Sequence, residues 1–274
     1  MQNNVKICFI GGGNMAQALI GGLADKLTAA KNIHVMDVNA EALAKCEQLF
    51  GVTTSLSADA VIATADVWVF AVKPQQMYEV VTNLLPHFKN QLVISIAAGI
   101  RAEDLSRWLH GHKSIVRTMP NTPALIGKGI TGLVALSGVT AEQKLTANAI
   151  MQAVGETVWI EQEEQINAVT AVSGSGPAYV FYFLEAMQAA AVELGLSAEQ
   201  GKQLALATFA GATELAAQSD QTLAQLRENV TSKGGTTYAA LTSMQNNKVA
   251  ESIIEALHAA SQRGEELGVE FGKN

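Results

Sequence analysis

Three consecutive glycines near the start of the chain constrain its fold more than any other feature. Gly11 to Gly13 follow the apolar run CFI and precede NMAQALIGG, a stretch with the composition of a helix. Glycine is favoured where a backbone turns sharply or comes close to another group. With Ala16 the glycines form a G-x-G-x-x-A pattern, which between a strand and a helix is typical of a loop that binds a dinucleotide. The alternative is a plain glycine turn between the two elements.

Short apolar runs alternate with helical patterns from this loop to residue 161. The runs predict strands at 5–10, 33–37, 67–72, 92–96 and 114–118, with helices at 40–50, 75–85 and 102–109. Two further strand-like runs, 131–135 and 157–160, flank one more helix and should extend the same sheet. This alternation predicts a Rossmann-type, doubly wound parallel sheet, and the nearly all-apolar strands predict helices on both faces.

Beyond residue 161 the strand pattern disappears, and Ala, Leu, Glu and Gln dominate. We expect a dinucleotide-binding domain at 1–161 and an all-α-helical domain for substrate binding and dimerisation at 162–274. The helices are rich in alanine (EAMQAAAVELGL, LALATFAGATELAAQ), so each contributes only a small apolar face. A modest core of this kind favours burial against a second copy of the chain, and we expect a homodimer.

Composition restricts the classes of partner. The chain has 274 residues and a formal net charge of −7, without a cluster of Lys or Arg, which argues against nucleic acid. Neither Cys8 and Cys46 nor the LHGHK histidines, His110 and His112, have the setting of a metal site, so no metal is expected. The start MQNNVKICFI lacks a signal-peptide pattern, and no apolar stretch approaches the ~20 residues that cross a bilayer. We therefore expect a cytoplasmic protein without a membrane partner.

The end of the second expected strand, HVMDVN, bears on the choice of nicotinamide cofactor. Asp37 suits hydrogen bonds from a ribose 2′-hydroxyl and would repel a 2′-phosphate, which favours NADH. Asn39 suits donation to a phosphate, which favours NADPH. A third interpretation is that Asp37 caps the next helix. The residues alone leave the choice of cofactor open.

Further motifs lie where strands or loops end. FAVKP at 70–74 and SIAAG at 95–99 follow two expected strands, at the edge where a doubly wound sheet receives its ligand. RTMPNTP at 117–123 is a stiff loop that presents Asn121 and Thr122. In each case the alternative is an ordinary loop with only a structural role.

Two glycine-rich stretches in the helical part precede helices. They are SGSGPAYVF, from Ser173, and NVTSKGGTTYAAL, from Asn229. Each predicts a helix N-terminus whose exposed N–H groups bind an anion such as a carboxylate, and ordinary capping is the alternative.

Taken in order, the segments IGGGNMAQAL, AVKP, SIAAG, RTMPNTPALIGKG, AVSGSGPAYVF and SKGGTTYAAL closely resemble those of pyrroline-5-carboxylate reductases. The similarity runs from Val5 to the final helix. It implies an NAD(P)H-dependent oxidoreductase that reduces the cyclic imine 1-pyrroline-5-carboxylate to L-proline, the last step of proline biosynthesis. In that family the glycine loop and the AVKP and IAA segments hold the cofactor, and the helical domain forms an interlocked dimer that completes the active site. The family commonly prefers NADPH, so we expect NADP(H), with NAD(H) as the alternative.

The motifs and the resemblance together imply a set of site residues. The expected cofactor contacts are Ile10, Gly11, Gly12, Gly13, Asn14, Met15, Asp37, Asn39, Ala71, Val72, Lys73, Pro74, Ile96, Ala97 and Ala98. The expected substrate contacts are Glu163, Asn229, Gly235, Thr236 and Thr237, with Thr237 as the catalytic contact to the ring nitrogen. One departure is Lys233, where the family usually has proline, so we expect a less rigid loop here.

Two other functions fit parts of the sequence. A β-hydroxyacid dehydrogenase would share the architecture, but it needs a catalytic lysine on a helix of the second domain, and residues 178–196 contain none. A non-catalytic NADP-binding redox sensor is the second alternative. The expected anion sites at Ser175 and Gly234 argue against a sensor. An assay in which no coenzyme is oxidised would favour it over an enzyme.

Overall fold

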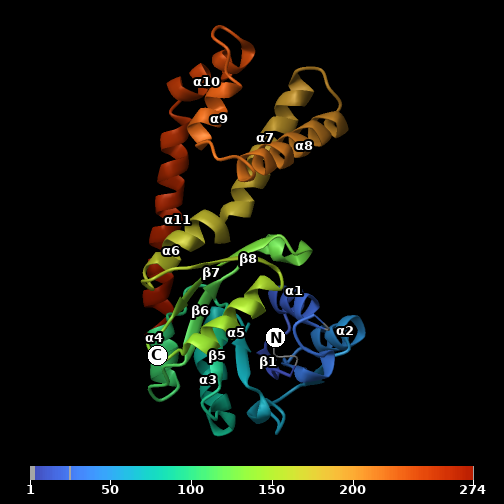
Figure 1. Ribbon diagram of the computed structural model, residues 1–274, viewed down its shortest axis with the longest axis vertical. Helices are drawn as coiled ribbons and strands as arrows, with labels where there is room; N and C mark the ends of the chain where they lie inside the picture. The colour runs from blue at the N-terminus through green and yellow to red at the C-terminus, as the bar shows by residue number, and fades with distance from the viewer. Residues whose placement is uncertain (1–3, 25, 274) are drawn as a thin grey trace. The chain divides into compact units, whose positions relative to one another are not determined.

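The computed structural model describes residues 4–24 and 26–273 (Figure 1). Its contacts form two compact units, one of Met1–Ser175 with Ala259–Asn274 and one of Gly176–His258. We call them the sheet unit and the helical unit. Residues 162–175 and the end of the last helix thus group with the sheet, while the functional boundary expected at residue 161 stays a prediction.

The sheet unit contains one eight-stranded sheet in the order β3-β2-β1-β4-β5-β6-β7-β8. Its strands are β1 (Ile7–Ile10), β2 (Ile33–Met36), β3 (Thr53–Ser55), β4 (Val67–Phe70), β5 (Leu92–Ser95), β6 (Ile115–Met119), β7 (Gly129–Ala135) and β8 (Gly155–Trp159). All neighbouring pairs are parallel except β6 and β7. The expected doubly wound sheet is confirmed, and each of the seven expected strands has a counterpart in it.

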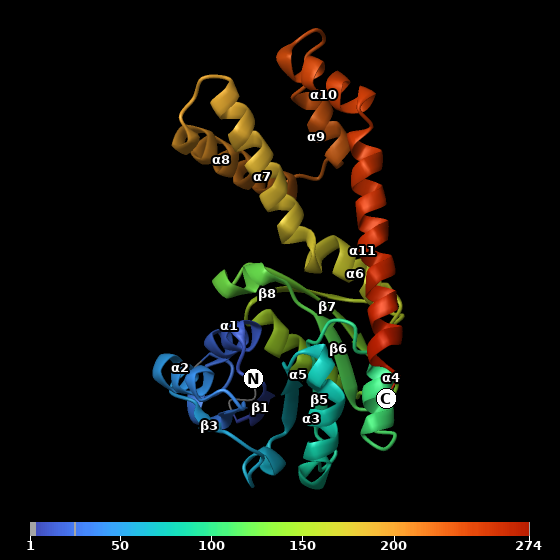
Figure 2. The same ribbon diagram turned by 180° about the vertical axis from the view of Figure 1, so that it is seen from behind.

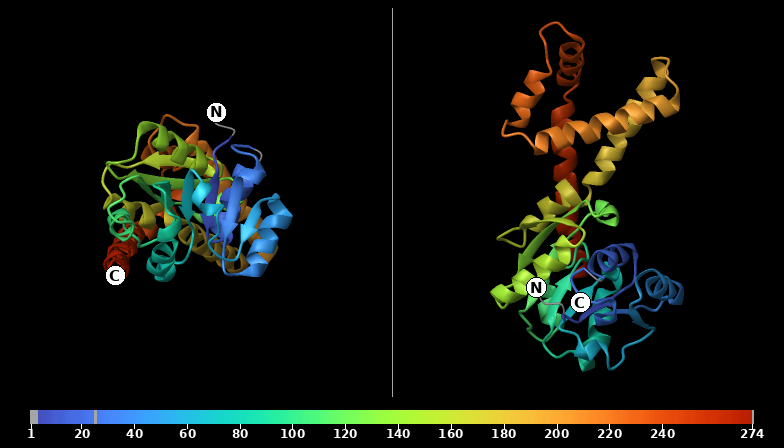
Figure 3. Two further views of the ribbon diagram at one scale, coloured as in Figure 1. Left: turned by 90° about the horizontal axis from the view of Figure 1, so that it is seen from below. Right: turned by 45° about the vertical axis from the view of Figure 1, so that its right-hand side comes forward.

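Helices cover both faces of this sheet, as the left view of Figure 3 shows. They are α1 (Asn14–Leu23), α2 (Ala40–Phe50), α3 (Met77–Leu84), α4 (Ala102–Trp108), α5 (Ala141–Gln152) and α6 (Gln165–Val169). Alternate side chains of β1 point to opposite faces. Ile7 and Phe9 pack with α1, α2 and α5, whereas Cys8 and Ile10 pack with α3 and α4. These helices are labelled around the sheet in Figures 1 and 2. Burial raises the pKa of the Cys8 thiol to about 12, which keeps it protonated and unreactive.

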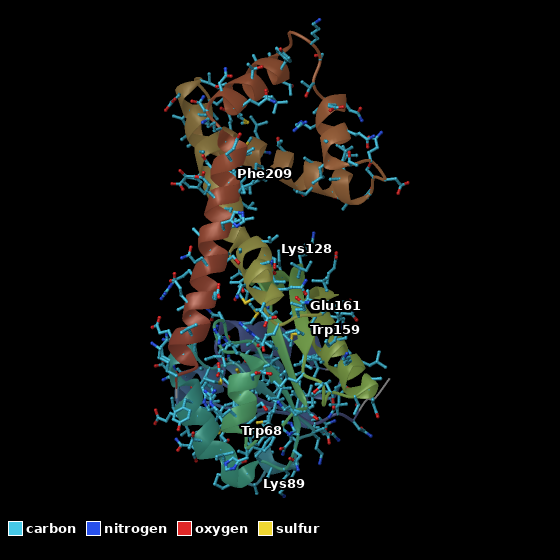
Figure 4. The ribbon with its side chains drawn as sticks, turned by 90° about the vertical axis from the view of Figure 1, so that its left-hand side faces the viewer. Trp68, Lys89, Lys128, Trp159, Glu161 and Phe209 are labelled. Carbon is cyan, nitrogen blue, oxygen red and sulfur yellow. The ribbon has the colours of Figure 1, made fainter. Side chains whose placement is uncertain are left out.

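Trp68 on β4 shows how closely the second cluster is packed. Its side chain is fully buried in the sheet unit (Figure 4), and its indole Nε1 donates a hydrogen bond to the Ile62 carbonyl at 2.8 Å. The ring also meets Phe70 and Phe88 edge to face. Such an arrangement satisfies the polar atom of a tryptophan that is otherwise surrounded by apolar groups.

The strand β3 was not predicted, because its sequence, TTS, is short and polar. It pairs with β2 through backbone hydrogen bonds and through His34. The two ring nitrogens of His34 lie 2.8 Å from Thr53 Oγ1 and 2.9 Å from Ser55 Oγ. Burial lowers the pKa of His34, so the neutral ring has one donor and one acceptor for these hydroxyls.

The antiparallel pairing of β7 with β6 has a simple cause. The two strands are joined by a stiff connection that contains only the 3₁₀ helix η5 (Thr122–Ile126). A parallel pair needs a crossover of a dozen or more residues, which this connection does not provide. Asn121 supports the turn, because its Oδ1 accepts from the Ile130 N–H and its Nδ2 donates to the Ser173 carbonyl.

The helical unit contains no strand among its described residues, as expected. It consists of α7 (Gly176–Glu193), α8 (Ala198–Ala217), α9 (Leu223–Asn229), α10 (Thr236–Asn246) and the first part of α11 (Val249–Phe271). Close approach of α7 and α8 depends on Gly201, where a Cβ atom would lie 2.8 Å from that of Ala191. Within the described part of the chain, no helix is both long and apolar enough to cross a membrane.

The helical unit leaves much apolar surface uncovered in a single chain. No residue of α7, α9 or α10 is buried, and α8 buries only Gly201 and Ala205. Phe181 and Tyr182 on α7 are 64% and 70% exposed. An apolar surface of this extent is typical of an interface. The observation supports the expectation that these helices are buried against a second copy.

This surface predicts that the smallest folded species is a dimer. Sedimentation at low protein concentration should show it, and Phe181→Asp should shift the equilibrium toward monomer because a charge would be buried at the interface. The matched control is Leu145→Asp on α5, a residue 72% exposed in the sheet unit, which should leave the dimer intact. A folded wild-type monomer would contradict the prediction.

Candidate active site

The expected cofactor segments meet at one edge of the sheet. The carboxyl ends of β1, β2, β4 and β5 lie side by side, because these strands are parallel neighbours. Residues 10–15, 37–39, 71–74 and 96–98 lie at or just after these ends. The strand order reverses between β1 and β4, and doubly wound sheets bind their ligands at such a point.

Gly11 and Gly13 serve different purposes in the glycine loop. Gly11 has φ of +105°, and a Cβ atom there would lie 2.7 Å from the carbonyl carbon and oxygen of Ala71. The Ala71 N–H in turn donates to the Ile10 carbonyl at 2.8 Å. At Gly13, by contrast, a Cβ atom would meet nothing within 4 Å. Gly11 is therefore required by the neighbouring backbone, and Gly13 faces open space where a ligand can approach.

The N-terminus of α1 has the properties of an anion site. Gly13 is its N-cap and provides no side-chain hydrogen bond, and the first turn has no acidic residue. The N–H groups at the start of a helix lack intrahelical partners and lie at its positive end. Gln17 holds the loop in shape by donating from Nε2 to the Gly12 carbonyl at 2.8 Å. These residues fit the pyrophosphate of a dinucleotide.

Asp37 is fastened to the glycine loop. Its Oδ2 accepts from the Gly12 N–H at 2.6 Å, and its Oδ1 accepts from the Asn39 N–H at 2.8 Å. Asn39, not Asp37, caps α2, through bonds from the N–H groups of Glu41 and Ala42. The interpretation of Asp37 as the cap of α2 is therefore wrong. Each carboxylate oxygen retains an acceptor position, so a ribose contact is still available to Asp37.

The segments after β4 and β5 are held by backbone contacts. Pro74 begins the 3₁₀ helix η3 (Pro74–Gln76), directly after the exposed Lys73. The Ile96 N–H donates to the Phe70 carbonyl at 3.1 Å, and the Ala97 N–H donates to Ser95 Oγ at 3.3 Å. Backbone and small side chains thus form this part of the edge, as expected for a surface that receives a ring.

Among the expected substrate residues, Glu163 belongs to the sheet unit. Its Oε1 accepts from Arg117 Nη1 at 2.9 Å and from the Ala102 N–H at 2.6 Å. Arg117 is the residue that sequence reasoning missed, since it received no role within RTMPNTP. The available signal was a charged residue inside an apolar strand, because a buried charge requires a partner.

The other expected substrate residues belong to the helical unit. Gly235 is the N-cap of α10 without a side-chain cap, and Thr236 and Thr237 form the first turn. Gly234 has φ of +74°, which turns the chain into the helix. Asn229 ends α9, where its Nδ2 donates to Gln221 Oε1 at 2.8 Å. The Gly235 N–H donates to the Ser232 carbonyl at 3.0 Å, so the open N–H groups at this helix start are those of Thr236 and Thr237.

The stretch SGSGPAYVF, from Ser173, has a different setting from the one expected. A π-helix at Thr170–Gly174 continues directly from α6, and the Ser175 N–H donates to the Thr170 carbonyl at 2.8 Å. Ser175 therefore lies between two helices instead of following a loop. Of the two helix starts, α10 is the one that retains the features of an anion site.

Comparisons with known proteins agree with this geometry. Residues 163–267 match the family model described as pyrroline-5-carboxylate reductase dimerisation, and residues 6–99 match that of NADP oxidoreductases dependent on coenzyme F420. A pyrroline-5-carboxylate reductase of Pseudomonas aeruginosa is 46% identical over 269 residues, which cover 98% of each chain. The chain belongs to the pyrroline-5-carboxylate reductase family. The resemblance found in the sequence is confirmed.

Solved structures of the family also match over nearly the whole chain. A pyrroline-5-carboxylate reductase from Coxiella burnetii has a TM-score of 0.90 at 40% identity and covers 97% of this chain and 99% of its own. A pyrroline carboxylate reductase from Plasmodium falciparum, solved with NADP bound, has a TM-score of 0.87 at 31% identity and covers 98% and 100%. The family fold therefore includes both the sheet and the helices of this chain.

The two glycines of the loop can be separated by experiment. Gly11→Ala should lower the free energy of unfolding by about 1–3 kcal/mol, because the new side chain meets backbone at a positive φ. Gly13→Ala should leave the melting temperature unchanged but raise the Kd of NADPH by about tenfold, because only an approaching ligand would meet the methyl group. Thermal unfolding and NADPH titration measure both effects. Equal effects of the two variants on stability would contradict this division of roles.

Asp37 should influence the choice between coenzymes. Asp37→Ser removes a negative charge from the place where a 2′-phosphate would lie, so the ratio of kcat/KM for NADPH to that for NADH should rise by about tenfold. Glu41→Gln, which removes a charge from the exposed first turn of α2, is the control and should change the ratio little. An unchanged ratio in Asp37→Ser would show that the carboxylate acts only on the glycine loop.

Proposed function

We propose that this protein is a pyrroline-5-carboxylate reductase, which reduces 1-pyrroline-5-carboxylate to L-proline with NAD(P)H as the last step of proline biosynthesis. The observation that carries the proposal is the similarity to the Pseudomonas aeruginosa enzyme over nearly the whole of both chains. The matched span covers both the start of α1 and the start of α10. A shared nucleotide-binding domain alone would not include the second feature.

The sheet edge supports NADP(H) as the cofactor, with NAD(H) as the alternative. In the proposal the N–H groups of α1 hold the pyrophosphate, and Asp37 and Asn39 lie by the adenosine ribose. The segments 71–74 and 96–98 hold the remainder. When bound, the reduced cofactor supplies a hydride. The chain's own contribution there is to bind and orient through backbone and small side chains.

The start of α10 supports the binding of a carboxylate. The N–H groups of Thr236 and Thr237, after the N-cap Gly235, lie at the positive end of an 11-residue helix without a side-chain cap, whereas the Gly235 N–H is taken by the Ser232 carbonyl. We assign the substrate carboxylate to these groups and the ring nitrogen to the Thr237 hydroxyl. A protonated cyclic imine is already a cationic electrophile, so the site needs to hold its ring in place more than to provide a strong acid. Asn229 and Glu163 as substrate contacts stay predictions.

The exposed apolar surface of the helical unit and the dimerisation family model support a homodimer. In the proposal, helices of two copies complete each active site, and an assembly of several dimers is a further expectation. We place this reaction in the cytoplasm, where NAD(P)H is available.

A β-hydroxyacid dehydrogenase is the weaker alternative, because α7 contains no lysine to act as its catalytic group. Oxidation of NADPH and NADH, followed with and without 1-pyrroline-5-carboxylate, tests the proposal. Substrate-dependent oxidation with formation of proline is expected. Binding of the coenzyme without turnover would favour the redox sensor instead.

Thr237 allows the sharpest test of the substrate assignment. Thr237→Ala keeps the main chain of α10 but removes the hydroxyl, so kcat/KM for the imine should fall by roughly tenfold to a thousandfold. The Kd of the cofactor should hardly change. Thr237→Val is the closer control in shape and should behave like Ala. Rescue by Val would show that the threonine only fills space, and wild-type turnover in both variants would remove Thr237 from the mechanism.

A further inference from the structure

Glu163 and Arg117 form an ion pair in the sheet unit that the expected substrate role of Glu163 does not explain. We propose that the two are positioning residues, which hold the loop 96–101 in the shape that receives the nicotinamide. This inference rests on the proposed cofactor role of residues 96–98. It assigns to Glu163 an effect on the cofactor that acts through the loop, and it gives Arg117 a function.

Arg117 is anchored next to the start of the loop. It lies on β6 directly opposite Ser95, the last residue of β5, in the parallel register of these strands. Thr118, the next residue on β6, donates from Oγ1 to the Ser95 carbonyl at 3.0 Å. Ser95 Oγ in turn accepts from the Ala97 N–H. The strand that carries Arg117 therefore also holds the first residues of the loop.

Glu163 is attached to the other end of the loop. Arg101 is the N-cap of α4 and makes no side-chain capping bond, so this helix lacks a cap from its own sequence. Glu163, 61 residues away, accepts from the Ala102 N–H at 2.6 Å. A carboxylate at a helix start satisfies an open N–H group and suits the positive end of the helix. Glu163 thus caps α4 across the fold.

One carboxylate oxygen joins the two ends. Glu163 Oε1 accepts hydrogen bonds from both the Ala102 N–H and Arg117 Nη1. The Glu163 side chain is 18% exposed and that of Arg117 is 5% exposed. Buried ion pairs are costly to break, because the remaining charge loses its partner away from water. The ion pair therefore connects the end of β5 with the start of α4, and the loop between them has both ends fixed.

The middle of the loop has a contact of its own. Gly99 has φ of +74°, and a Cβ atom there would lie 2.9 Å from that of Leu267 and 3.1 Å from the ring of Phe271. Ala97 is buried in the cluster with residues of α3 and α4, whereas Ile96 and Ala98 are partly exposed. The backbone of residues 96–98 therefore lies between two fixed points, Ser95 at the end of β5 and Gly99 against α11.

The competing role, a direct contact with substrate, makes a different prediction. Glu163 lines a groove of about 1120 Å³ and its side chain is 18% exposed, so a direct contact with a small molecule is the role to be distinguished. Substitution of a residue that contacts the substrate should raise the KM for 1-pyrroline-5-carboxylate and leave the Kd of the cofactor unchanged. A positioning residue should affect cofactor binding in the absence of substrate.

The experiment measures NADPH affinity and loop protection without turnover. In Glu163→Ala the Kd of NADPH should rise by about tenfold, with faster amide hydrogen exchange at residues 96–102 before cofactor is added. Glu163→Gln keeps an acceptor for the Ala102 N–H, so its Kd for NADPH should rise only about threefold. The Kd of Arg117→Lys should lie between those of the two Glu163 variants. The KM for 1-pyrroline-5-carboxylate, measured at saturating NADPH, should stay within about twofold.

The control is Glu164→Gln, which removes the neighbouring exposed carboxylate of the same groove and should change none of these quantities. A raised KM for the imine with unchanged NADPH affinity would overturn the proposal in favour of a substrate contact. A lower melting temperature with unchanged NADPH affinity would also overturn it, as a purely structural role. If the wild-type protein binds NADPH but does not reduce the imine, the proposed function fails, whereas NADPH affinity and exchange still decide the role of the pair.

Discussion

The close approach of two backbone segments, at Gly11 and at residues 71–72, is the constraint on which the rest of the site depends. It places the loop after β1 directly against the end of β4, at the point where the strand order reverses. A side chain at this position would separate the two segments. With the approach intact, Gly12 reaches Asp37 after β2, and the ends of three strands become one surface. The cofactor edge is thus built from backbone atoms whose positions follow from the sheet.

The second group of site residues follows a different principle. At α10 the anion site comes from the helix start itself, with Gly235 as N-cap and no side chain satisfying the first N–H groups. At α4, a short helix, the equivalent group is satisfied by Glu163 from a distant part of the chain. One helix start is therefore left open for a ligand, and the other is closed by the protein. The difference explains why glycines precede α10 and threonines form its first turn, while a buried ion pair supports α4.

Sequence reasoning succeeded where the information was local. The glycine loop, the apolar strands and the change to alanine-rich helices all follow from short-range patterns, and the motif order identified the family. It failed where a distant partner decides the structure. The polar strand β3 exists because His34 bridges to Thr53 and Ser55, and Asp37 binds a loop 25 residues away instead of capping α2. The bond between Glu163 and Ala102 spans 61 residues, and no periodicity indicates it.

The final helix has a consequence for the order in which the molecule can be made. Gly264 and Gly268 in α11, and Gly272 just after its end, let this segment approach Asn167, Arg101 and Asp104 elsewhere in the sheet unit. Arg107 donates to the Gly272 carbonyl at 2.6 Å. The sheet unit is therefore discontinuous in the chain, with Gly176–His258 between its parts. During synthesis on a ribosome, the nucleotide-binding strands emerge early but lack this helix until the whole intervening segment has been translated. Until then the surface around Gly99, which Leu267 and Phe271 of α11 cover in the finished fold, is exposed. Protection by chaperones during translation would therefore matter most at that surface.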